Sequence, residues 1–294
     1  MPKKRPFAQV DVFTGAACLG NPLAVVLDAE DLSTETMQRF THWTNLSEAT
    51  FLLPPTPAGA AQGADYRVRI FCPGRELPFA GHPTLGSAHA WLAAGGVPQR
   101  ADRIVQECGA GLVSIRQDGN RLAFAAPPLR RSGPLDEADV ARIAQGLGID
   151  RREILAHAWC DNGPGWRAVL LGDAQRVLDL TPDPQLLGPL DLGLVAPVSG
   201  AQNALHSCAS GHFDYVIRAF FPGNQGLAED PVTGSLNAAV AQWLMGAGLA
   251  PERYVAAQGQ RLGRQGRVHL ERDRDGTVWV GGESVTVIAG AVTL

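Results

Sequence analysis

The sequence predicts an α+β protein built from two related lobes, each with many strands and one central apolar helix. Two observations carry this prediction. The chain has 294 residues, which is long enough for two domains of ordinary size. The stretch from Tyr66 to Leu92 also returns, altered, as the stretch from Tyr215 to Leu244, and each copy reads as a strand, a glycine-bearing loop and a helix. We therefore expect a duplicated fold whose lobes are related by a pseudo-twofold axis.

The boundaries of the two lobes follow from the segments that flank the repeats. The Pro- and charge-rich segment Ala126–Asp139 is expected to cross from the first half to the second. The closing strand, Glu283–Leu294, is expected to return and pair with the first half. The N-terminal lobe is therefore expected to comprise residues 1–129 with the returning strand 283–294, and the C-terminal lobe residues 130–282.

The offset between the two copies changes along the repeat. His82 aligns with Asp230 and Gly86 with Gly234, but the offset is four residues larger where Trp91 aligns with Trp243 and Gln106 with Gln258. The four extra residues are expected inside the second helix. Four residues are close to one helical turn, so the insertion would preserve which face of the helix is buried.

The remaining elements of each half follow from apolar alternation and turn residues. Ser33 is the expected N-cap of a helix that carries Met37, Phe40 and Trp43 on one stripe. Asp-Gly pairs, which favour tight hairpin turns, close two expected hairpins at Asp118-Gly119 and Asp275-Gly276. The expected strands outside the repeats and hairpins are Phe7–Thr14, Leu23–Leu27 after a turn at Gly20–Pro22, Ala49–Leu53 and Arg167–Asp173.

Composition excludes several classes of function. The chain is 45% hydrophobic and 18% charged, as in globular proteins, and its net charge of -4 gives no basic surface for nucleic acid. The sequence contains no signal peptide that would predict secretion. It also contains no apolar run of about 18 residues that would predict a membrane span. An odd number of scattered cysteines without a CxxC pair argues against zinc and a disulfide framework and favours a reducing cytoplasm; these are Cys18, Cys72, Cys108, Cys160 and Cys208.

Both copies of the repeat place glycines directly before a helix. Unpaired amides at a helix N-terminus attract anions, so Gly81, Gly86, Gly234 and Ser235 form a candidate cradle for a carboxylate or phosphate. The alternative is that these glycines only permit tight turns and close helix packing. Two similar lobes would meet at a shared cleft, and this favours the binding role.

Three side chains are candidates for proton transfer or for binding an amino group. His82 and Asp230 each precede a proline at the same position of the repeat, although both are also common turn residues and Asp230 could cap a helix. Glu229, beside Asp230, is expected to be solvated. Glu48 stands just before an apolar strand, where desolvation would raise the pKa of its carboxyl group. The alternatives are an exposed loop residue and half of a local cap with Ser47.

Common cofactor and nucleophile signatures are missing from the sequence. It contains no GxxxxGK[ST], HExxH or GxSxG, and the segment Gly109–Ser114 lacks the third glycine and the helix of a dinucleotide fingerprint. Cys72 and Cys208 have no base beside them that would make a reactive thiolate, and both are expected to be buried or incidental.

The strings DVFT, GNPLAVVL, NLSEATF, FAGHPTLGSA and EDPVTGS, followed by QG and GR.G, together resemble the PhzF-like family of phenazine-biosynthesis isomerases and their relatives. The resemblance covers nearly the whole chain. It implies the diaminopimelate-epimerase-like fold, in which each lobe is a curled, mostly antiparallel sheet around a central helix and the active site lies between the lobes. It also implies no metal, no organic cofactor and a homodimer.

The resemblance assigns a role to each candidate. Glu48 matches the family's acid/base glutamate, and His82 and Asp230 match the residues that bind or polarise polar groups of the substrate. Ser235 matches the serine of the DPVTGS motif, while Gly81 and Gly234 match the positions whose amides hold a carboxylate.

The sequence also departs from related patterns. Epimerases of this fold carry two cysteines at positions that align here with Ala80 and Pro231, which argues against racemisation by two thiols. Ala49 and Cys72 stand where phenazine enzymes usually have threonine, which leaves the substrate open.

The function implied is a cofactor-free isomerase that moves a proton between carbons of a small metabolite bearing an amino group and a carboxylate. The reference reaction of the family is the isomerisation of trans-2,3-dihydro-3-hydroxyanthranilate. The alternatives are a related protein that binds a small molecule without catalysis, an amino-acid racemase or epimerase, and a nucleotide-dependent hydride transferase, which the missing fingerprint disfavours.

Overall fold

A computed structural model describes residues 2–198, 212–223 and 226–294. The protein is α+β and dominated by its sheet. It divides into two compact units, Met1–Ala125 with Gly281–Leu294 (unit 1) and Ala126–Val280 (unit 2), which are described separately below. In the described ranges, none of the helices has the length and apolar character needed to cross a bilayer.

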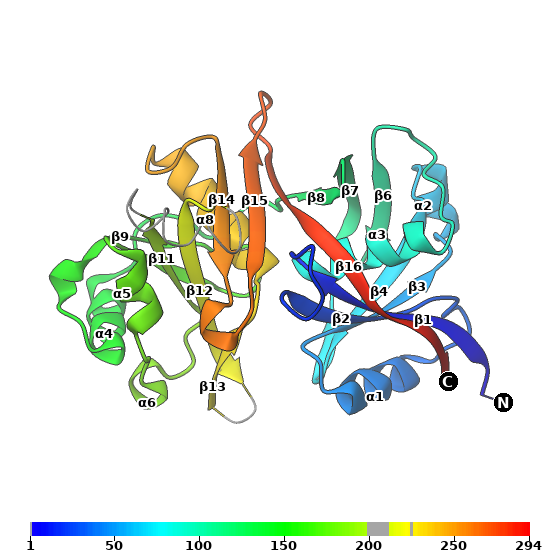
Figure 1. Cartoon of the computed structure of the whole chain (residues 1–294), viewed down its shortest axis with the longest axis horizontal. Coiled ribbons are helices and arrows are strands. Elements are labelled where there is room, and N and C mark those ends of the chain that lie inside the picture. Colours follow the sequence, from blue (N-terminus) through cyan, green and yellow to red (C-terminus); the bar gives the residue numbers. More distant parts are fainter. Residues whose placement is uncertain (1, 199–211, 224–225) are drawn as a thin grey trace. The chain divides into compact units, whose positions relative to one another are not determined.

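Unit 1 is a sheet in which both ends of the chain pair with each other. Its strands follow the order β1-β2-β3-β4-β6-β7-β8, and β16 pairs antiparallel with β1 (Figure 1). The pairs β2–β3 and β4–β6 are parallel. The expected return of the closing strand to the first half is thereby confirmed. The bounds are β1 (Lys4–Val12), β2 (Asn21–Val26), β3 (Ala49–Leu53), β4 (Tyr66–Cys72), β5 (Arg75–Leu77), β6 (Ile104–Cys108), β7 (Gly111–Asp118), β8 (Arg121–Ala125) and β16 (Val278–Thr293).

The central element of unit 1 is helix α3 (Gly81–Ala93), which contacts β1, β2, β3, β6 and β8. Because strands surround it, the helix is apolar on all sides rather than amphipathic, and nine of its residues are buried. Gly86 lies inside this helix, where an added Cβ would come within 2.6 Å of Leu23 and 2.9 Å of Val12. Gly86 therefore permits close packing of the helix on the sheet and is not part of an anion cradle at the helix start, contrary to the expectation.

The opposite face of the unit 1 sheet is covered by α1 (Thr34–Thr44), which Ser33 caps as expected by accepting from the Thr36 amide. Met37 and Phe40 pack into the apolar cluster on this face. Trp43 differs from the prediction: it is 77% exposed, because it projects at the rim of the helix rather than into the core. A short helix, α2 (Pro57–Ala61), follows β3.

Unit 2 repeats the pairing order of unit 1. Its strands run β9-β10-β11-β12-β14-β15, again with parallel pairs at the second and fourth junctions, β10–β11 and β12–β14. Its helices α4, α5 and α6 pack with the sheet in one apolar cluster. The bounds are α4 (Glu137–Leu147), β9 (Ile154–Trp159), β10 (Arg167–Leu171), α5 (Ala174–Asp179), α6 (Pro184–Leu187), β11 (Leu192–Pro197), β12 (Tyr215–Gly223), β13 (Gly226–Asp230), α8 (Gly234–Gly246), β14 (Arg253–Gln258) and β15 (Gly266–Arg272).

The expected insertion inside the second repeat helix is wrong. Both α3 and α8 have 13 residues, and each begins at a glycine, Gly81 or Gly234. The extra residues lie before α8, in the connection that contains β13 and Asp230. His82 is therefore equivalent to Ser235, the second residue of its helix, and not to Asp230. For the same reason Ala80, which directly precedes α3, and Pro231, which lies three residues before α8, are not equivalent positions.

Candidate active site

Glu48 and His82 lie side by side in unit 1. Glu48 directly precedes β3, His82 is the second residue of α3, and His82 Nε2 lies 3.5 Å from Glu48 Oε2. Both side chains are largely shielded from solvent, at 6% exposure for His82 and 18% for Glu48. The fold thus joins two of the residues that the sequence singled out.

The local fold explains how residues so distant in the sequence meet. Strands β2 and β3 are parallel neighbours, so Asn21 at the start of β2 and Glu48 just before β3 lie at the same end of the sheet. Helix α1 ends at Thr44, and its C-cap residue Asn45, with a left-handed φ of 56°, turns the chain toward Glu48. The first turn of α3, which carries His82, lies against this end of the sheet.

The tautomer of His82 follows from its neighbours. The side-chain nitrogen of Asn21 lies 3.4 Å from His82 Nδ1, and an amide nitrogen can only donate, so Nδ1 accepts. The ring hydrogen is then on Nε2, which faces the Glu48 carboxylate. Burial lowers the pKa of His82 to about 3, so the ring is neutral at neutral pH. The contact is therefore between a neutral N–H group and a carboxylate rather than an ion pair.

The start of α3 has backbone amides available for a ligand. Its N-cap, Ala80, has no side chain that could cap, and the first bond within the helix runs from the Thr84 amide to the Ala80 carbonyl. Gly81 and His82 therefore precede the bonded part of the helix. The buried Gln106 donates to Thr84 Oγ1 at 3.1 Å and so fixes the first turn.

Asp230 lies at the end of β13 in unit 2 and faces the start of α8. Its carboxylate accepts a 2.5 Å hydrogen bond from the hydroxyl of Thr233, the N-cap of α8. Gln258, fully buried, binds both sides of this turn: it donates to the Asp230 carbonyl at 3.1 Å and accepts from the Thr233 amide at 3.0 Å. It also accepts from the Asn237 side chain at 2.8 Å. Asp230 is thus held in place next to the start of the helix through its bond with the N-cap residue.

Ser235, the second residue of α8, is oriented by the loop before β10. Trp166 Nε1 donates to the Ser235 hydroxyl oxygen at 3.1 Å, and the Asn162 side chain donates to the Ser235 carbonyl at 2.8 Å. Since an indole N–H only donates, the serine oxygen accepts this bond and its own hydrogen can point elsewhere. Gly234 beside it is the first helical residue, and the side chain of the N-cap residue Thr233 makes no capping hydrogen bond.

Glu229 is not solvated as expected. It forms a buried ion pair with Arg218 at 2.8 Å, in which the side chains of Arg218 and Glu229 are only 5% and 11% exposed. Because neighbouring residues of a strand point to opposite faces, Glu229 points away from the side occupied by Asp230. Of the two cysteines considered, Cys72 is partly buried, and Cys208 lies outside the described residues.

Sequence analysis missed the residues that orient the candidates. Asn21 is the first residue of β2, and Asn162 lies in the loop before β10. The strings GNP and NGP contain them near the start of similar apolar strands, and each contacts the second residue of a repeat helix. The repeated Asn was therefore a signal in the sequence. Gln106 and Gln258 were aligned in the two copies, but their buried contacts with Thr84 and Asn237 depend on the tertiary fold.

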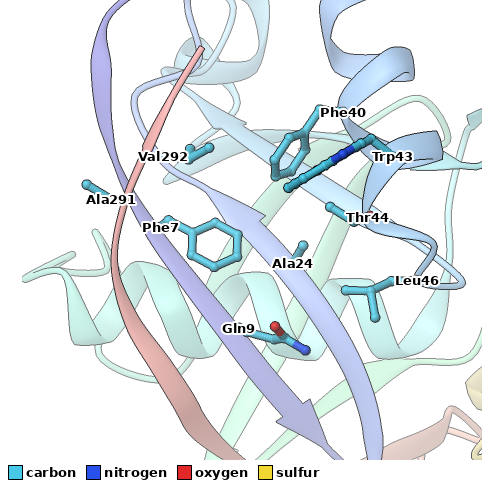
Figure 2. Close-up of a pocket in the computed structure, with 9 residues that line it drawn as sticks. All are labelled: Phe7, Gln9, Ala24, Phe40, Trp43, Thr44, Leu46, Ala291 and Val292. Atoms are coloured by element: carbon cyan, nitrogen blue, oxygen red, sulfur yellow. The ribbon is translucent and has the colours of Figure 1, made fainter.

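The candidate residues thus fall into two groups, one in each unit. Unit 1 contains Gly81, His82 and Glu48, and unit 2 contains Asp230, Gly234 and Ser235. Within residues 2–198, 212–223 and 226–294, no three His, Cys, Asp or Glu side chains come together in an arrangement that could hold a metal ion. The pocket in Figure 2 is lined by none of the candidates.

Comparison with known proteins relates this chain to one family over nearly its full length. The sequence model of the family described as phenazine biosynthesis-like protein, PhzC-PhzF, matches residues 10–290. Antisense-enhancing sequence 1 of Schizosaccharomyces pombe is 34% identical, and the match covers 97% of each chain. The trans-2,3-dihydro-3-hydroxyanthranilate isomerase of Pseudomonas aeruginosa is 32% identical over 92% of this chain and 91% of that protein.

The fold is also similar to a solved structure. The crystal structure of a PhzF-family phenazine biosynthesis protein from Enterococcus faecalis matches with a TM-score of 0.78 and 24% identity, covering 99% of this chain and all of the other. Fold, motif order and sequence identity agree along nearly the entire length. The chain therefore belongs to the PhzC-PhzF family of phenazine biosynthesis-like proteins.

Proposed function

We propose that the protein is a cofactor-independent isomerase that moves a proton between two carbons of a small metabolite bearing an amino group and a carboxylate. The observation that carries this proposal is the pair of Glu48 and neutral His82, a carboxylate and an N–H donor held 3.5 Å apart in a largely buried setting. The family relationship supports it, because relatives of similar length are named isomerases.

In the proposed reaction Glu48 carries the proton. Its carboxylate takes a proton from a carbon that a neighbouring alkene and amine make acidic, and the electron pair left behind shifts through the conjugated system. While it is held on the Glu48 carboxyl group the proton exchanges with solvent, and the protonated Glu48 then delivers a proton to another carbon, so substrate and product have the same composition and no oxidant is needed. A positioned acid/base group of this kind contributes about 10²–10⁴ in rate.

His82 contributes as a neutral hydrogen-bond donor in this scheme. Because the ring stays uncharged, it can donate from Nε2 to the Glu48 carboxylate or to a polar atom of the substrate without introducing a positive charge. We propose that Asp230 and Ser235 bind the amino and hydroxyl groups of the substrate. The amides of Gly81 and Gly234, at the starts of helices without side-chain caps, suit its carboxylate.

Proton NMR in D₂O tests this function. The purified protein is incubated with trans-2,3-dihydro-3-hydroxyanthranilate first, and then with other cyclic amino acids that carry a conjugated alkene. Deuterium entering at a new carbon together with a moved double bond is the expected result. Exchange at the α-carbon with loss of optical activity would instead identify a racemase, and binding without any exchange would identify a catalytically silent relative.

A further inference from the structure

The turn that follows β14 carries a side-chain amide whose two polar atoms have no partner. This 3-10 turn, η2 (Gln260–Leu262), begins directly after Gly259, and backbone hydrogen bonds to the Gly259 carbonyl hold it closed. Oε1 and Nε2 of Gln260 are both shielded from water, and neither forms a hydrogen bond with the residues that the structure describes. Among those residues, Gln260 is the only one whose side-chain amide has both polar atoms buried and unbonded.

The amide of Gln260 is buried although the rest of the residue is partly exposed. Gln265, in the same connection between β14 and β15, is exposed. A glutamine near the surface normally extends its amide into water, because a buried donor and acceptor without partners cost free energy. Such local violations are expected at functional sites, where a ligand supplies the missing hydrogen bonds.

The connection between β14 and β15 packs on the segment that contains the candidate residues of unit 2. A Cβ added to Gly259 would come within 2.6 Å of the Pro231 carbonyl oxygen. At the other end of the connection, a Cβ added to Gly266 would come within 2.4 Å of the Val232 side chain. Both ends of the connection are therefore fixed against the loop that runs from Asp230 to the start of α8, and η2 starts one residue after the first of these contacts.

A second unbonded amide atom lies at the same end of the unit 2 sheet. Strands β10 and β11 are parallel, β11 and β12 are antiparallel, and β12 and β14 are parallel, so the start of β10 and the end of β14 are at one end of the sheet. Asn162, in the loop before β10, donates from its amide nitrogen to the Ser235 carbonyl, whereas its Oδ1 is buried without a partner in the described part of the chain. Unused amide groups thus lie near both ends of the segment 230–235.

We infer that Gln260 is a specificity-determining residue, whose side-chain amide binds a neutral group of the substrate that both donates and accepts a hydrogen bond, such as a hydroxyl or a carboxamide. The inference rests on the proposed function, since it adds a contact to the same site. An amide carries no charge to pair with a carboxylate or an ammonium group. A site with buried polar groups of this kind discriminates against a ligand that lacks the matching group, because its own donor and acceptor then stay unbonded.

Binding of three small aromatic acids to the full-length protein tests the inference without turnover. Anthranilate has only an amino group and a carboxylate, 3-hydroxyanthranilate adds a hydroxyl, and 2-amino-3-carbamoylbenzoate adds a carboxamide. Calorimetry is expected to show that the wild type binds one of the latter two at least about tenfold more tightly than anthranilate, and the preferred acid identifies the group. Gln260→Met nearly keeps the side-chain volume but removes both polar atoms, so it should abolish the preference. Gln265→Met, at the exposed position, is the matched control and should retain it.

Unfolding in urea gives an independent readout for the same variants. Gln260→Met removes a buried donor and acceptor that have no partners, so it should be at least as stable as the wild type. A Gln260→Met protein that is less stable than Gln265→Met would show that the amide forms hydrogen bonds within the fold. A wild type that binds the three acids equally, or binds none of them, would contradict the assigned ligand group. Either result would overturn the inference.

Failure of this inference can be told apart from failure of the proposed reaction. A ligand preference that depends on Gln260, in a protein that incorporates no deuterium into any substrate, would retain the inference and exclude the isomerase function. Deuterium incorporation with the same KM for the wild type and Gln260→Met would retain the isomerase function and overturn the inference.

Discussion

At the scale of single residues, the central feature is a carboxylate beside an imidazole that burial keeps neutral. Glu48 lies in contact with His82, and Asn21 fixes the imidazole tautomer from the other side. A charged histidine at this place would hold the Glu48 carboxylate as a salt bridge and weaken it as a base. A neutral N–H donor orients the carboxylate while leaving it able to accept a proton.

Replacing Glu48 with Gln is expected to remove most of the activity while leaving the fold nearly intact. Glutamine keeps the volume and the hydrogen-bonding capacity of the side chain, so packing costs should be small. An amide cannot accept a proton from carbon at neutral pH, so kcat should fall by about 10²–10⁴. The measurement is kcat and KM on the substrate identified by deuterium incorporation, together with thermal melts.

His82→Asn is the comparison for this variant. It changes a donor that contacts the substrate or the base, so KM is expected to rise along with the fall in kcat. A Glu48→Gln protein with nearly wild-type kcat would exclude Glu48 as the proton carrier, and Asp230 would then be the next residue to test.

The buried His82 also predicts how stability depends on pH. Burial lowers its pKa from 6.5 to about 3, so between these values the unfolded chain binds a proton that the folded chain does not. Stability from this residue is therefore fully present above about pH 6.5 and is lost as the pH falls toward 3, by up to about 1.4 kcal/mol per pH unit. Urea unfolding from pH 4.5 to 7.5 should show a shallower slope for His82→Gln than for the wild type.

His42→Gln is the matched control for the pH experiment, because His42 is exposed on α1. It should reproduce the wild-type slope. If His82→Gln and the wild type lost stability in parallel as the pH fell, the folded protein would be accommodating a charged His82, and a neutral donor role would be wrong.

At the scale of elements, the repeat determines how the candidate residues are presented. In each unit an asparagine at or before the start of the second strand contacts the second residue of the central helix, and a buried glutamine fixes the first turn of that helix. The same scaffold therefore presents His82 in unit 1 and Ser235 in unit 2. The two copies thus share the asparagine and glutamine contacts at the start of the helix, whereas the side chain at its second position differs.

Sequence analysis predicted these elements more accurately than it aligned them. Apolar alternation and turn residues predicted β3 and both hairpins, because these signals are local. The predicted alignment is wrong at the loops before the helices, because a proline follows both His82 and Asp230 although these two residues are not structurally equivalent. Lengths of loops are set by tertiary packing, so only the structure could show that α3 and α8 begin at equivalent glycines. The contact between Glu48 and His82 joins separate elements and likewise had no local signal.

Packing of α3 on the sheet can be tested at Gly86. Gly86→Ala would place a methyl group within 2.6 Å of Leu23 and 2.9 Å of Val12, both fully buried side chains that cannot move freely. We expect a loss of about 1–3 kcal/mol in the free energy of unfolding, as for other overpacked core positions. Gly74→Ala is the matched control, since a Cβ there meets no atom within 4 Å. Equal stability of the two variants in urea unfolding would contradict the close packing of α3.

At the scale of the whole molecule, the two units differ in how the chain builds them. Unit 2 is one continuous segment, whereas unit 1 needs both ends of the chain, because β16 pairs with β1 along the full length of β1. The two ends are also joined by hydrogen bonds: the Lys3 amide donates to the Leu294 carbonyl at 2.7 Å, and the Leu294 amide donates to the Lys3 carbonyl at 3.0 Å. The sheet of unit 1 can therefore be completed only when β16 is present.

A rearranged chain tests this dependence. Two residues that exchange both backbone hydrogen bonds are the pair that closes a two-residue β-hairpin, so an Asn-Gly turn should connect Leu294 to Lys3 without strain. The chain 281–294, Asn-Gly, 3–125 supplies β16 next to β1 and is expected to fold by itself, with a cooperative thermal transition and a dispersed amide NMR spectrum. The plain segment 1–125 leaves β1 as an edge without β16 and should show neither. Cooperative unfolding of the plain segment 1–125 would mean that β16 is dispensable for unit 1, and the returning strand would then contribute to the surface of the fold rather than to its formation.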